Sequence, residues 1–122
     1  MTEEIEMNPT IRETVSLLLD NIRAMKAEPH NPHAADAFSE AIDAFARMVY
    51  DSGIWDENYR AKLKSLEKAD LSRISLEDVY SYFTAIIAIE RCFSGFIDQK
   101  LWDGTLEQLS IRYLDLTQED AK

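Results

Sequence analysis

The chain has few of the residues that turn a backbone sharply. Its 122 residues include only three glycines and three prolines. An all-β domain needs a turn signal about every 8–12 residues, so the sequence argues against a sandwich or a barrel. The hydrophobic content is nevertheless 46%. A chain of this length and content can bury one core, and we expect a single domain over residues 1–122.

Cysteine, positive charge and long apolar runs are also scarce. Cys92 is the only cysteine, so no disulfide can form within the chain, which fits a reducing cytoplasm. Lys and Arg number 13 against 23 Asp and Glu, a net charge of −10. Nucleic acid is a poor partner for such a chain, because phosphate binding needs a basic patch.

Targeting and membrane segments are not predicted either. The first residues, MTEEIEM, are acidic and do not resemble a signal peptide. The longest strongly apolar run, from Phe83 to Ile89, is far shorter than the roughly 20 residues that cross a bilayer. We therefore expect a cytoplasmic protein without a membrane partner.

Apolar residues at three- and four-residue steps predict an all-α fold. The first two helices, residues 9–27 and 32–51, open at Asn-Pro pairs, since Asn accepts a bond from a free amide and Pro suits the first helical position. A third helix follows Asp56 and ends near residue 69. The next helix, about residues 76–94, is so apolar that we expect neighbours on more than one side.

Glycines and caps complete the predicted bundle. Gly53 ends the second helix, and Gly95 either ends the apolar helix or lets a neighbour approach closely. The chain continues helically to Trp102, and Thr105 with Gln108 forms a capping box for a last helix. We predict a single-domain bundle of about five helices around the central helix at about 76–94, with residues 1–8 and 117–122 frayed.

His30, His33 and Asp36 are the nearest approach to a metal site, with Glu28 beside them. Imidazole and carboxylate groups suit zinc, but structural zinc needs four committed ligands. The chain has no further histidine and no second cysteine. We therefore favour exposed loop residues here and predict neither a metal nor a cofactor.

Glu90 and Arg91 interrupt the central helix where it should be buried. Buried charges cost several kcal/mol each unless they are paired. One interpretation is a buried ion pair that joins helices. The candidate partners of Arg91 are then Asp51, Asp56, Asp98 and Asp103.

The other interpretation of the same pair is a cleft that also contains Trp55 and Trp102. Arg91 would hold an anionic ligand through two parallel hydrogen bonds, and the indole rings would form the apolar walls. The two tryptophans are equally suited to anchor a protein interface. The sequence leaves these alternatives open.

No catalytic motif is present: the chain has no Ser-His-Asp set, no Gly-rich phosphate loop and no His-Glu-x-x-His pattern. Cys92 lies in the most apolar helix and is expected to be a buried, inert thiol. Arg60, Lys64 and Lys68 form a basic row, which is either a solvated face or a contact for an acidic partner. We therefore predict no catalytic residues.

The C-terminal half resembles an uncharacterised family of small bacterial domains. The residues that carry the resemblance are Val49-Tyr50-Asp51, Trp55, the run from Glu90 to Gly95, Asp103-Gly104, Leu106 and Leu109. That family has an acid-Arg-Phe-x-x-Gly motif and a second Gly before a Leu-rich final helix. The resemblance covers residues 45–116, although Cys92 stands here where the family has Phe. It implies a helical fold and no known activity.

Together these observations predict a small acidic helical protein that acts as a protein–protein interaction module. Its partner would be another protein or a second copy, since two-fold dimers are the commonest soluble assemblies. The alternative is a small-molecule-binding protein, or an undiscovered enzyme, with a cleft around Glu90 and Arg91. The candidate ligand or interface residues are Trp55, Glu90, Arg91 and Trp102.

Overall fold

The computed structural model describes residues 10–118, which form six α-helices and one short 3-10 helix. This part of the chain contains no strand, which confirms the prediction of an all-α fold. In chain order the elements are α2 (Ile11–Ala27), α3 (Pro32–Asp51), α4 (Tyr59–Lys68), η1 (Leu71–Arg73), α5 (Leu76–Cys92), α6 (Phe96–Trp102) and α7 (Thr105–Leu116).

The two predicted Asn-Pro starts have different outcomes. Asn31 opens α3 as predicted, because its Oδ1 accepts from the backbone N–H of His33 at 2.9 Å. Residues 8 and 9 lie outside the described part of the chain, and α2 begins after Thr10. The Thr10 hydroxyl accepts from the N–H of Glu13, whose carboxylate accepts from the N–H of Thr10, both at 3.1 Å. This capping box satisfies backbone donors that the helix leaves free.

Two glycines determine where the later helices begin. Gly95, with φ +101°, is the N-cap of α6, so the central helix ends at Cys92 rather than at residue 94. A Cβ at Gly95 would meet nothing within 4 Å, so glycine is favoured here because of the positive φ and not because a neighbour packs closely. Gly104, with φ +89°, is the N-cap of α7, and the predicted capping box of Thr105 is wrong. Asp103 accepts from the Thr105 N–H at 2.8 Å instead.

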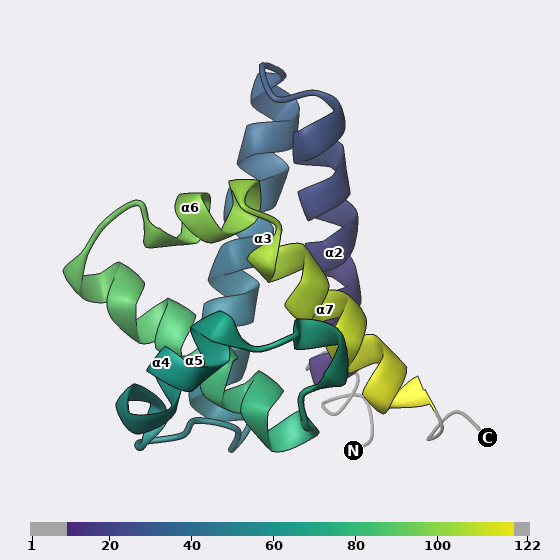
Figure 1. Cartoon of the computed structure of the whole chain (residues 1–122). Coiled ribbons are helices and arrows are strands. Elements are labelled where there is room, and N and C mark those ends of the chain that lie inside the picture. The colour runs from purple at the N-terminus through teal and green to yellow at the C-terminus, as the bar shows by residue number, and fades with distance from the viewer. Residues whose placement is uncertain (1–9, 119–122) are drawn as a thin grey trace, which may run out of the picture.

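The α2 and α3 helices form an antiparallel hairpin, and α7 packs along α2 (Figure 1). The α5 helix lies at the centre, since it contacts α3, α4, α6 and α7. This confirms the prediction that the apolar helix is covered on several sides. Within residues 10–118, no helix combines the length and the apolar character needed to cross a bilayer.

The core forms where α2, α3, α5 and α7 meet. Phe45 and Phe83 are fully buried and pack edge to face, with ring centroids 4.9 Å apart at 88°. Such a pair contributes about 0.5–1.5 kcal/mol beyond the area it buries. The other large side chains that are fully buried include Val15, Leu18, Ile22, Val49, Val79, Ile86, Leu101, Leu106 and Leu109.

The end of α7 is tied to the start of α2. Arg12 donates to the carbonyl of Leu114 at 3.0 Å and to the hydroxyl of Thr117. Thr117, which the sequence predicts to be frayed, is therefore held against α2. Residues 1–8 and 119–122, which we also predict to be frayed, lie outside the described residues.

Candidate functional site

Three of the four predicted site residues lie near one another, at the end of α5 and in the loop between α3 and α4. Arg91 donates to the Tyr50 hydroxyl at 2.8 Å, and its guanidinium carbon lies 5.7 Å from the centre of the Tyr50 ring. The Tyr50 ring stacks on Trp55 at 4.8 Å and 15°. Trp55 in turn meets Tyr59 edge-on at 6.3 Å. We call Arg91, Tyr50, Trp55 and Tyr59 the aromatic–arginine cluster.

The predicted burial of Arg91 is wrong. Its side chain is exposed, because Arg91 lies in the last turn of α5, beyond the part that neighbouring helices cover. No carboxylate of residues 10–118 forms an ion pair with it. Of the expected partners, Asp56 pairs with Lys62 at 3.1 Å and Asp103 with Lys100 at 3.7 Å. Arg91 therefore keeps donors that no described carboxylate uses.

Glu90 has a local structural role. Its two carboxylate oxygens accept from the backbone N–H groups of Ile97 at 2.8 Å and Gly95 at 3.2 Å. The N-cap residue of α6 is Gly95, which has no side chain to accept these bonds. Glu90 supplies the acceptor from the preceding helix, and a negative charge is favourable at a helix start. This contact fixes the turn between α5 and α6.

A groove runs between α3 on one side and the end of α5 with the start of α6 on the other. We call it the α3–α6 groove. It consists of two adjoining depressions, of about 520 and 440 Å³, that share Ile42, Asp43, Glu90 and Ile97. Arg91 and Tyr50 line only the first depression, and Asp98 lines only the second. The aromatic–arginine cluster therefore borders one end of this groove.

Trp102 is not part of this arrangement. It is the last residue of α6, is 49% exposed and does not line the groove. The predicted cleft of two tryptophans around Glu90 and Arg91 therefore forms only in part, with Trp55 behind Tyr50 and Trp102 elsewhere. The start of α6, with Ile97 and Asp98, lines the groove, whereas Trp102 lies at the opposite end of that helix.

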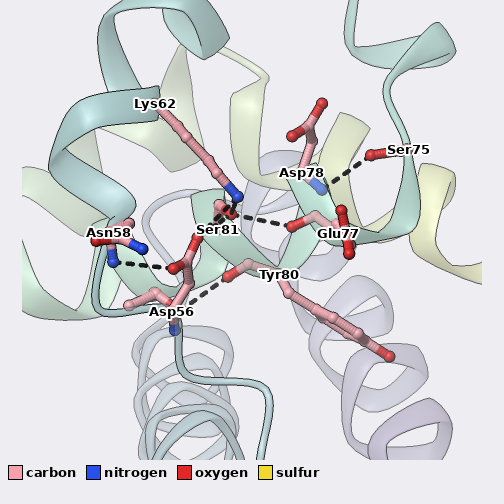
Figure 2. Close-up of polar contacts among 9 residues, drawn as sticks. Asp56, Asn58, Lys62, Ser75, Glu77, Asp78, Tyr80 and Ser81 are labelled. Carbon is pink, nitrogen blue, oxygen red and sulfur yellow. Dashed lines mark hydrogen bonds and ion pairs between the residues drawn. The ribbon is translucent and has the colours of Figure 1, made fainter.

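Asp56, Lys62 and Ser81 form a compact polar cluster between α4 and α5 (Figure 2). The Ser81 hydroxyl donates to the Asp56 carboxylate at 2.5 Å, and the Lys62 ammonium lies 3.1 Å from the same oxygen. The other Asp56 oxygen accepts from the N–H of Asn58 at 2.9 Å, so α4 begins at Tyr59, later than predicted. The Asp56 N–H donates to the Thr84 hydroxyl at 3.1 Å.

This polar cluster anchors the loop that carries Trp55 and lacks the electrostatics of a Ser-Lys nucleophile. Chiefly the hydrogen bond from Ser81, and then that from Asn58, holds the pKa of Asp56 below its usual range. The hydrogen bond to Asp56 raises the pKa of Lys62. A lysine that activates a serine needs a lowered pKa. Ser81 is also only 1% exposed, so the contacts hold Trp55 in position and do not form a Ser-Lys nucleophile.

The remaining predicted residues are exposed. His30 lies at the tip of the α2–α3 hairpin, and His33 and Asp36 lie in the first two turns of α3. In the described residues, no three side chains of His, Cys, Asp or Glu are placed to hold a metal ion. Cys92 is exposed, so the prediction of a buried thiol is wrong: the last turn of α5 extends beyond the core.

Sequence reasoning missed Tyr50 and Asp43 as site residues. Both are exposed on α3, next to the buried stripe that contains Phe45 and Val49. The seven-residue step between Asp43 and Tyr50 equals about two helical turns, which places them on one face. That periodicity was a usable signal. Nothing in the sequence showed that the end of α5 and the start of α6 would lie beside this face of α3.

No family model, no curated protein and no solved structure matches the chain. The resemblance to small bacterial domains therefore stays a prediction.

Proposed function

We propose that this protein is a protein–protein interaction module that binds its partner along the α3–α6 groove and the aromatic–arginine cluster. The observation that carries this proposal is Arg91, an exposed arginine held by Tyr50 beside an apolar groove. Trp, Tyr and Arg are the residues most enriched in the energetic centres of protein interfaces. Phe93, which is 70% exposed, adds an apolar side chain two residues further on.

The rigid support of these side chains favours binding. The Asp56 contacts hold the loop of Trp55, and the Trp55 ring supports Tyr50. Glu90 fixes the turn that follows Arg91. A surface that is already in its bound geometry loses less conformational entropy on association. The arrangement therefore supports a preformed contact surface.

A small-molecule site is the less well supported alternative. Such sites commonly enclose 70–90% of the ligand surface. Three of the charged groups that line this groove, Asp43, Arg91 and Asp98, are exposed. The net charge of −10 favours proteins over nucleic acids as partners. We also propose a cytoplasmic location, for which the single cysteine gives the support.

The test is an affinity pull-down from a lysate of the native host, read by quantitative mass spectrometry. The parent is compared with Arg91→Ala and with Arg73→Ala, a matched loss of an exposed arginine outside the groove. Trp102→Ala serves as a second comparison. We expect a stoichiometric partner that is retained by the parent, by Arg73→Ala and by Trp102→Ala but lost by Arg91→Ala.

Two results contradict the proposal. One is the absence of any stoichiometric partner under conditions in which the bait is folded, as shown by its helical circular dichroism signal. The other is a partner that survives Arg91→Ala and is lost in Trp102→Ala, which would move the contact to the end of α6.

A further inference from the structure

We infer that the partner contributes one short amphipathic segment with a positive charge at one end, an apolar centre and a carboxylate at the other, lying along the α3–α6 groove. This inference rests on the proposed function and specifies the chemistry of the partner. It follows from how charge is distributed along the groove. Because the segment is defined by its charges, peptides of known composition can test it.

The groove has opposite charges at its two ends. Along α3 its lining residues run from Phe38 and Ser39, beside Asp98, to Tyr50, beside Arg91. Asp43 lies between them and lines both depressions. The carboxylate of Glu90 also lines both depressions and keeps its negative charge, although two backbone N–H groups donate to it. The charge along the groove therefore runs from negative at Asp98 and Asp43 to positive at Arg91, which Glu90 partly offsets.

The floor of the first depression is apolar, although Asp43 and Glu90 line this depression as well. Ile42, Ala46, Ile87 and Ile97 line the first depression between the charged residues. An apolar floor of this kind matches the pattern by which a groove binds the apolar face of an amphipathic helix. The twelve-residue step from Phe38 to Tyr50 corresponds to about 18 Å of helix, so a segment of about twelve helical residues covers the groove.

Charge complementarity selects this occupant over the others. A carboxylate of the partner would use the open donors of Arg91, whose position the Tyr50 hydroxyl already restricts. A lysine or arginine would meet Asp43 and Asp98. The overall charge of −10 attracts a partner with a basic end and repels a second copy of this chain.

The experiment measures fluorescence polarisation with three labelled peptides of about twelve residues that share a Leu/Ala centre. One has lysines at one end and glutamates at the other, one has lysines at both ends, and one has glutamates at both. The proteins are the parent, Arg91→Glu and the double variant Asp43→Lys with Asp98→Lys. Circular dichroism verifies that each variant keeps the helical content of the parent.

The parent should prefer the peptide with opposite ends by about three- to fivefold in Kd, the size expected for one partly exposed ion pair. Arg91→Glu should shift the preference to the peptide with lysines at both ends. The double variant should shift it to the peptide with glutamates at both ends. These reversals, in folded variants, would support the inference.

Failure of all three peptides to bind the parent at about 1 mM would overturn the inference, as would preferences that do not change in the charge variants. The inference would also be overturned if the parent sedimented as a dimer and Arg91→Glu dissociated this dimer. That result would show that a second copy of the chain occupies the groove. If a lysate partner still depends on Arg91 when the peptides fail, the proposed function stands and only the segment chemistry is wrong.

Discussion

Replacing Asp56 with alanine tests whether the polar cluster anchors the loop of Trp55. The Asp56 side chain is only 20% exposed, and its carboxylate accepts from Ser81 at 2.5 Å, Asn58 at 2.9 Å and Lys62 at 3.1 Å. A hydrogen bond to a charged group contributes about 1.5–3 kcal/mol, and an exposed ion pair about 0–1 kcal/mol. Ser81 keeps a second acceptor, the Glu77 carbonyl at 3.0 Å, so no buried hydroxyl becomes unpaired. We expect a loss of about 2–3 kcal/mol in unfolding free energy.

Urea denaturation followed by tryptophan fluorescence measures this loss, and Trp55 lies next to the substituted residue. The matched control is Glu57→Ala, which removes an exposed carboxylate from the same loop and should change the unfolding free energy by less than about 0.5 kcal/mol. If Asp56→Ala behaved like this control, the anchor would not exist as described. A large loss in both variants would show that the loop responds to any change of charge.

The pH dependence gives a second test of the same contacts. The hydrogen bonds from Ser81 and Asn58 lower the pKa of Asp56 in the folded protein. A carboxyl with a lowered folded pKa stabilises the fold above its unfolded pKa, about 3.9, and loses this effect as pH falls through the folded pKa. The difference between the parent and Asp56→Ala should be complete at pH 7 and shrink below about pH 4. A difference that grows toward acid pH would refute the argument.

Two further variants and one labelling experiment test other features. Arg91→Ala should reduce the unfolding free energy by no more than about 1 kcal/mol, because Arg91 is exposed and bonds only Tyr50 among the described residues. A loss of several kcal/mol in urea denaturation would instead support the interpretation of a buried ion pair. Gly95→Ala should cost about 1–2 kcal/mol through its φ of +101°, and an unchanged urea midpoint would contradict this. Native Cys92 should react rapidly with a thiol-specific reagent, and reaction only after unfolding would show that it is buried.

The fold was largely predictable because each helix contains its own signals. Asn31 with Pro32 marked the start of α3, and the run of apolar residues in α5 predicted a covered central helix. Predictions failed where a second feature, local or distant, competed with the local signal. Thr105 matches a capping pattern, but Gly104 takes the N-cap position because it can adopt a positive φ. Asp56 caps a turn before α4, and its second oxygen is used by Ser81, 25 residues away.

The candidate site was less predictable, because its contacts join distant residues. Arg91 meets Tyr50 across 41 positions, and the exposure of Arg91 depends on how far α5 extends beyond its neighbours. The sequence alone determined the helices, their buried faces and the acidic charge, because these depend on residue type and short-range spacing. Only the tertiary structure decided that Arg91 is exposed, that Glu90 caps α6 and that a groove has opposite charges at its ends. Those properties depend on which helix ends lie side by side.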